Sequence, residues 1–393
     1  MFERINKLEM EQKQKEIPEN FEQGADLLLE EGDQLMAKNH GFEGDQKVYH
    51  TLEEHIGPLQ ERAERMGDIL GLSIEQRKLI AVAISWHDTT IEYDAPDQEN
   101  IVGMVRRHRG ARKGDQPMET MGNEALSADA MEETMRRINA NANKDIFSQE
   151  QIEKARWAID ATYPDVDLGP DWKGAEFEKK PAYYEKKEST LKESILYEEV
   201  VLKNPRVQEM LNFLRAHGIT KGPHFFQPHL ENPLEEGKQV PEEVMVVAMS
   251  DLGAAGLGGI DEFAREGDNE GKESYHNLRK PENIERLITG DENKDNEDRT
   301  RVATALLNWW GSQPGFAMWQ MMRFIKIMNC MEKNGQLTLD KKEKFENLFS
   351  HYEENIKSAV ERSERVKGEY EHIKESEGDK KAFEHLAQEM KYV

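Results

Sequence analysis

The sequence predicts an all-α protein, and three observations indicate this fold class. Apolar residues between positions 19 and 39 recur at helical spacing. Thr51 and Glu54 form a capping-box pattern, which is typical of the start of a helix, and Gly71 follows as a natural helix end. The apolar stretch 79–86 belongs to a pattern that runs from about 74 to 87, which is too long for a typical strand.

Further helices are predicted along the rest of the chain, at 123–139, 148–161, about 191–217, 242–256, 301–332 and about 339–375. The stretch 163–190 is rich in proline, glycine, aromatic and charged residues, which indicates an inserted loop. The block at 309–328 is rich in tryptophan and methionine and is expected to lie in the core.

The expected organisation is therefore an N-terminal helical extension, a central helical domain with an insertion, a polar and mobile connection, and C-terminal helices that pack on the central domain. These parts correspond to residues 1–45, 46–265 with the insertion at about 163–241, 266–300 and 301–393.

The amino-acid composition argues against several classes of protein and of binding site. The 393 residues include 53 lysines and arginines against 78 aspartates and glutamates, a formal net charge of −25, which argues against extended nucleic-acid binding. Cys330 is the only cysteine, so an intrachain disulfide and a cysteine-based zinc or iron–sulfur site are excluded. The chain begins without a signal-peptide pattern and contains no apolar run of roughly 18 residues, so we expect no membrane span and a cytoplasmic location.

The polar pair His87-Asp88 ends a buried apolar helix and is the most informative feature of the sequence. Burying two polar groups is costly unless each has a partner. A divalent metal is one such partner, because imidazole nitrogen and carboxylate oxygen together suit a first-row metal. The alternative is an ordinary helix C-terminus that accommodates both residues.

Two other predicted helices carry residues of the same kind. His50 and His55 lie at the start of the helix predicted at 51–70, and Asp251 interrupts a row of small and apolar residues at 244–259. A carboxylate in such a row needs a partner or solvent. The histidines and aspartates of three helices therefore form a candidate ligand set, unless each one simply faces water.

The arrangement resembles the HD-domain superfamily of metal-dependent phosphohydrolases, whose motif is H…HD…D. The stretches that carry the resemblance are YHTLEEHIGPLQERAERMGDILGLS, LIAVAISWHDTTIEYD, NEALSADAMEETM and VAMSDLGAAG, and together they cover residues 48–263 loosely. The resemblance implies an all-helical bundle with one divalent metal ion between helices, which could be Mn, Fe, Zn, Co, Ni or Mg. It implies the ligands His55, His87, Asp88 and Asp251, and hydrolysis of a nucleotide or another small phosphoester by a metal-activated water.

The sequence departs from this family pattern in three places, one of which is the long insertion before Asp251, which could form a lid or a partner surface. The other two concern the ligands. Four residues separate His50 and His55 where the family usually has three, so either histidine could be the ligand. We favour His55 because its distance to the HD pair fits one helix and its connection, which leaves His50 near the substrate as a proton donor or phosphate contact. Relatives often carry a histidine near positions 161–164; none is present here, which favours a single metal.

Other residues are assigned to the reaction by their type and position. Asp88 could also orient the attacking water, and Glu92 could face the same cleft if the helix continued by one turn. Arg106, Arg107, Arg109 and Lys113 could bind the phosphate, since guanidinium groups fit phosphate oxygens.

Two alternatives to a phosphohydrolase stay open. The first is an HD-type di-iron oxygenase, which needs two irons and more histidine ligands than the sequence places. The second is a helical binding or scaffold protein that keeps the HD fold without turnover, for which the acidic surface and the long terminal helices are suitable.

Overall fold

Helices form most of the part of the chain that the computed structural model describes, which confirms the all-α prediction. The described residues are 17–39, 49–90, 93–94, 101–102, 106–107, 122–167, 175–177, 200–291 and 294–392. Within these ranges, no helix combines the length and the apolarity that crossing a membrane requires.

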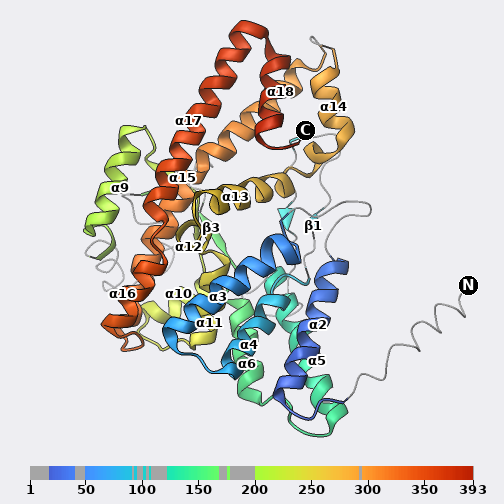
Figure 1. Ribbon diagram of the computed structural model, residues 1–393, viewed down its shortest axis with the longest axis vertical. Helices are drawn as coiled ribbons and strands as arrows, with labels where there is room; N and C mark the ends of the chain where they lie inside the picture. The colour runs from blue at the N-terminus through green and yellow to red at the C-terminus, as the bar shows by residue number, and fades with distance from the viewer. Residues whose placement is uncertain are drawn as a thin grey trace, which may run out of the picture.

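Helices from residues 21–160, together with one later helix, build a helical bundle that occupies the lower part of Figure 1. Its members are α2 (Phe21–Asn39), α3 (Gly57–Leu70), α4 (Ile74–Trp86), α5 (Asn123–Ala142), α6 (Gln149–Asp160) and α11 (Glu242–Asp251). Helices α4 and α11 contact each other and also pack against α3 and α6. Residues 243–250 of α11 and nearly all of 79–86 of α4 are buried, as expected for helices that are apolar on all sides. Both central helices end at the polar residues singled out above.

The insertion contributes short elements between α6 and α11. Strand β3 (Asp165–Asp167) pairs antiparallel with β6 (His224–Phe226), and β4 (Ala175–Glu176) pairs antiparallel with β5 (Lys221–Gly222). Two helices complete it, α9 (Pro205–Ala216) and α10 (Pro228–Glu235). Of the helix predicted at about 191–217, residues 191–199 lie outside the described residues. Helix α9 begins at Pro205, where the Asn204 side chain accepts a hydrogen bond from the Arg206 backbone N–H.

The second half of the chain is dominated by two long helices that lie side by side, α15 (Asn296–Lys333) and α17 (Tyr352–Glu377) (Figure 1). Around them lie α12 (Ala254–Leu257), α13 (Ile260–Ser274), η4 (His276–Arg279), α14 (Pro281–Thr289), α16 (Leu339–Leu348) and α18 (Asp379–Glu389). The single helix predicted at about 339–375 is thus two helices, interrupted at residues 349–351.

Two hydrophobic cores hold the described residues together. The larger core joins the first bundle to the C-terminal half of α15 and the N-terminal half of α17. The smaller core joins the other halves of these two helices to α14 and α18. The Trp- and Met-rich block is buried as predicted, with Trp310 in the smaller core and Trp319 in the larger one. The C-terminal helices therefore pack on the first bundle through a shared core.

The described residues of the segment 266–300, which we expected to form a polar and mobile connection, are mostly helical. Its described residues form the end of α13, η4, α14 and the start of α15. Its charged residues are partly buried in ion pairs: Glu266 pairs with Arg62 of α3, and both oxygens of Asp268 accept hydrogen bonds from Arg362 at 2.8 and 2.9 Å. Pairing between helices thus accounts for the buried charges of this segment, while others, such as Glu282 and Glu297, are exposed.

Candidate metal centre

The turn that carries His55 is wider than an α-helical turn. Residues Leu52–Ile56 form a π-helical turn (η1), in which the Ile56 N–H donates to the Thr51 carbonyl at 3.1 Å. The Thr51 side chain caps this turn by accepting a hydrogen bond from the Glu54 N–H at 3.0 Å, as the capping pattern predicts. A π turn holds one more residue than an α turn and is frequent at functional sites. It therefore accommodates the long spacing between the two histidines.

The C-terminal end of α4 fixes the HD pair. The backbone N–H of His87 donates to the Ala83 carbonyl at 3.0 Å, so His87 completes the last turn of the helix. Its Nδ1 lies 2.7 Å from the Ile84 carbonyl oxygen. Because a carbonyl can only accept a hydrogen bond, Nδ1 carries the proton, and Nε2 faces the opposite way. Asp88 follows directly and is buried, with 3% of the residue exposed.

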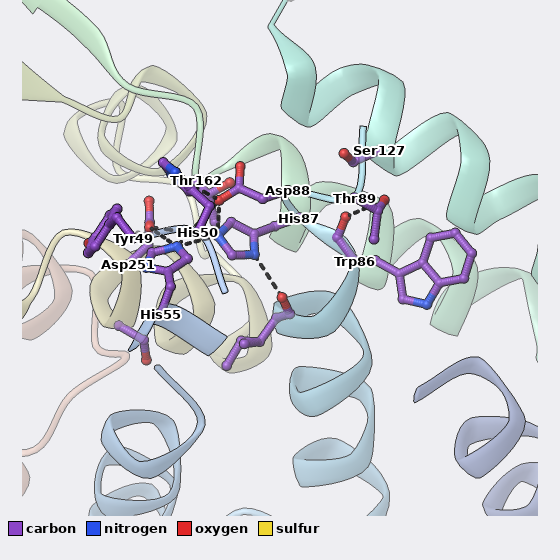
Figure 2. Close-up of polar contacts among 12 residues, drawn as sticks. Tyr49, His50, His55, Trp86, His87, Asp88, Thr89, Ser127, Thr162 and Asp251 are labelled. Carbon is purple, nitrogen blue, oxygen red and sulfur yellow. Dashed lines mark hydrogen bonds and ion pairs between the residues drawn. The ribbon is translucent and has the colours of Figure 1, made fainter. Parts of the chain in front are cut away.

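The structure brings together the four predicted ligands, as Figure 2 shows. The Nε2 atoms of His55 and His87 lie 3.2 Å apart. Oδ2 of Asp88 lies 3.3 Å from the first of these nitrogens and 2.9 Å from the second. Oδ1 of Asp251, the last residue of α11, lies 3.8 Å from each. One oxygen of Asp88 and one oxygen of Asp251, from separate segments, thus each lie within 3.8 Å of the same two imidazole nitrogens.

The donor atoms suit a divalent cation in type and in spacing. Metal–ligand bonds of about 2.1 Å at angles of about 90–110° place ligand atoms roughly 3.0–3.4 Å apart. The separations among His55, His87 and Asp88 fall in or next to this range, and Asp251 is slightly farther away. The Nδ1–H bond of His87 to a carbonyl is the support that metal-bound histidines usually have, whereas the buried Nδ1 of His55 makes no hydrogen bond.

His50 is a fifth member of the cluster and is held by Glu273. Its Nε2 lies 3.7 Å from Asp88 Oδ2, and its Nδ1 pairs with Oε1 of Glu273. The other oxygen of Glu273 accepts hydrogen bonds from the backbone N–H groups of Tyr49 at 3.0 Å and His50 at 3.2 Å. His50 is 2% exposed, and the Tyr49 ring packs against the rings of both His50 and His55.

Sequence reasoning missed Glu273, which lies 224 residues after Tyr49 in the chain. The only signal was that the acidic residues of α13 at 262, 266, 270 and 273 share one helical face. A second residue that it missed is Ser127 of α5, whose Oγ accepts a hydrogen bond from the Thr90 N–H at 3.0 Å and so holds the chain just after Asp88. Thr162, drawn with the cluster in Figure 2, is buried, and its hydroxyl donates a hydrogen bond to the Ile159 carbonyl at 2.8 Å.

The electrostatics of the cluster follow from burial and from Asp88. Burial lowers the pKa of His55 to about 3, against a smaller opposing effect of its hydrogen bond to Asp88. Burial also disfavours a charged His87, but the adjacent Asp88 carboxylate outweighs it and raises the pKa of His87 to about 9. Burial would raise the pKa of Asp88, yet the surrounding imidazoles hold that pKa well below its ordinary value. In the metal-free centre, therefore, His87 is protonated and His55 is neutral at pH 7.

Five further residues were predicted to take part in the reaction, and the structure describes only the backbone of Arg106 and Arg107 among them. Glu92, Arg109 and Lys113 lie outside the described residues. Arg106 and Arg107 form strand β2 (Arg106–Arg107), which pairs antiparallel with β1 (Tyr93–Asp94) shortly after the HD pair. The backbone thus brings this basic stretch back to the segment that leaves the cluster.

One other group of potential ligands occurs among the described residues, at Glu369, His385 and Glu389. Arg365 donates to Glu369 at 2.8 Å and to both oxygens of Glu389 at 3.2 and 2.9 Å. A guanidinium group therefore already neutralises these carboxylates, and the HD pair remains the candidate centre.

No protein-family model, curated protein or solved structure matches the chain.

Proposed function

We propose that this protein is a metal-dependent phosphohydrolase that hydrolyses a nucleotide or another small phosphoester. One divalent cation would be held by His55, His87, Asp88 and Asp251. The observation that carries the proposal is that the Nε2 atoms of His55 and His87 lie 3.2 Å apart and that each lies 2.9–3.8 Å from one oxygen of Asp88 and one oxygen of Asp251. The order of these residues in the chain, which resembles the H…HD…D pattern, supports the same proposal.

The residues of the site have different roles in the proposed hydrolysis, which follow from their positions. A divalent cation supplies two effects when bound: it lowers the pKa of a coordinated water and polarises a phosphoryl oxygen. The side chain of Asp251 is 14% exposed while those of His55 and His87 are each 2% exposed, so substrate would approach from the side of Asp251. Asp88, which contacts both imidazoles, is placed to orient the attacking water.

His50 is the proposed proton donor to the leaving oxygen, since its Nε2 faces Asp88 from beside the four ligands. It would donate from the imidazolium form, in which Nδ1 keeps its proton toward Glu273 and Nε2 gives up the second one. The proposed phosphate contacts remain Arg106, Arg107, Arg109 and Lys113. A guanidinium group can donate two parallel hydrogen bonds to phosphate oxygens, and a lysine ammonium acts as a point charge.

The test combines metal analysis with a substrate screen. Protein loaded with Mn²⁺, Fe²⁺, Zn²⁺, Co²⁺, Ni²⁺ or Mg²⁺ and freed of excess ion is analysed for metal content and assayed against nucleotides and other small phosphoesters. We expect about one ion per chain and metal-dependent phosphate release. The test variant is Asp88→Asn, which removes the carboxylate from the cluster. Its matched control is Asp145→Asn, which removes one negative charge at an exposed position far from the cluster in sequence.

Other results would contradict the proposal in recognisable ways. Two irons per chain with a visible absorption band would favour the oxygenase alternative. A folded protein that binds none of these ions would favour the binding or scaffold alternative.

A further inference from the structure

We propose that Glu273 is a positioning residue that holds His50 with its Nε2 directed at the four-ligand cluster. The inference rests on the phosphohydrolase function proposed above, because it gives the His50 side chain a task at that centre. Glu273 comes from α13, a helix outside the segments that supply the ligands.

The first argument is the direction of the two ring nitrogens. Nδ1 of His50 pairs with Oε1 of Glu273, while Nε2, on the other side of the ring, lies 3.7 Å from Oδ2 of Asp88. A carboxylate can only accept a hydrogen bond from the ring, so Nδ1 carries a proton toward Glu273. A half-turn of the ring would break this bond and direct Nε2 away from its present position.

The second argument is that the same carboxylate fixes the backbone that bears the ring. Oε2 of Glu273 accepts hydrogen bonds from the N–H groups of Tyr49 and His50, at 3.0 and 3.2 Å. One acidic side chain thus makes three hydrogen bonds to two consecutive residues. A glutamine has a single acceptor oxygen and cannot reproduce all three.

The third argument is the enclosure of the pair. The His50 and Glu273 side chains are 3% and 16% exposed, and the Tyr49 ring packs edge-on against His50 with the ring centroids 4.9 Å apart. Burying a carboxylate is costly unless it is fully bonded, so the His50–Glu273 pair is retained as a unit. Histidines at metal centres commonly depend on such a supporting carboxylate.

The experiment compares Glu273→Gln with Asp261→Asn, which removes one charge from an exposed position on the same helix. The first readout uses metal-free protein and does not depend on activity. In wild type, the proton spectrum should contain a far-downfield Nδ1–H resonance that is absent from His50→Gln. We expect this resonance to disappear or move upfield in Glu273→Gln and to persist in Asp261→Asn. Glu273→Asp, which keeps the carboxylate on a shorter side chain, should recover part of it.

The second readout uses metal-loaded protein. We expect Glu273→Gln to keep its metal content and KM while kcat falls by about 10- to 100-fold. The double variant His50→Gln with Glu273→Gln should lose no more than His50→Gln alone, since the two residues act as a unit.

Three results would overturn the inference: an unchanged Nδ1–H resonance in Glu273→Gln, loss of metal in that variant, or additive losses in the double variant. Failure of the proposed function would look different: the wild-type protein would show no metal-dependent phosphate release. The resonance comparison on metal-free protein would then still decide whether Glu273 positions His50.

Discussion

Loading the candidate centre with metal should release one proton, which is a quantitative consequence of the contact between His87 and Asp88. The Nε2 of His87 lies 2.9 Å from the carboxylate, which raises the pKa of His87 to about 9. At pH 7 to 8 this imidazole is almost fully protonated, and Nε2 must lose its proton before it can bind a cation. His55, with a pKa of about 3, releases none. We therefore expect about one proton released per ion bound.

The size of the effect can be worked out from the same pKa. A rise from 6.5 to about 9 corresponds to roughly 3 kcal/mol, at 1.36 kcal/mol per pKa unit. Because the pKa is raised in the folded state, this stabilisation of the metal-free protein is fully present below pH 6.5 and is lost as the pH rises through 9. Metal binding should show the opposite trend, with an affinity that rises about tenfold per pH unit over this interval.

The assay is titration calorimetry with Mn²⁺ at pH 7 and pH 8, in buffers that differ in ionisation enthalpy, so that proton release is counted directly. Asp145→Asn should behave as wild type, because Asp145 is exposed. Binding without proton release, at an affinity that does not change with pH, would refute the assignment of the proton to His87.

Three further predictions concern the site and the fold. Asp88→Ala should abolish metal binding and turnover while the far-ultraviolet circular dichroism stays near wild type; retained turnover would count against the site. Gly222→Ala places a Cβ 2.4 Å from the Cα of Gly315 and should destabilise the protein by roughly 1–3 kcal/mol. Gly368→Ala, on an open face of α17, should instead stabilise it by about 0.5–1 kcal/mol. Equal unfolding midpoints of the two variants would contradict this reasoning. Arg62→Met leaves two carboxylates of α13 without their guanidinium partner and should cost about 3–5 kcal/mol in urea unfolding; a loss below 1 kcal/mol would show that the pairs contribute little.

The helices and the four-residue cluster could be predicted because their signals are local. Thr51 and Ser73 start helices through side-chain caps, and the structure has both caps. A His-Asp pair at the end of a buried helix and an aspartate at the end of another point to a shared partner, since buried polar groups need one. The structure places these side chains together.

The rest depends on contacts between distant segments. Glu273 looks like any acidic residue in a charged helix until α13 is placed beside Tyr49 and His50. The charge of the segment 266–300 indicated exposure, and only tertiary pairing shows that part of it is buried. The start of α9, by contrast, has a local signal that the prediction of a helix from about 191 did not use. Asn204 is an N-cap residue, and a proline follows it at the first helical position.

The long helix α15 makes the two cores inseparable. Its N-terminal half contributes Leu306 and Trp310 to the smaller core, and its C-terminal half contributes Trp319 and Met322 to the larger one. A truncated chain ending after α16 would leave the apolar stripe of the N-terminal half facing water, and the ordered length of the helix would shorten from that end. Helix α13, which carries Glu273, is joined to this half by the hydrogen bond that the Trp309 ring N–H donates to the Gly267 carbonyl. Removal of the C-terminal residues would therefore also disturb the helix that holds His50. Limited proteolysis should accordingly yield no stable fragment that retains only the bundle with the candidate metal centre.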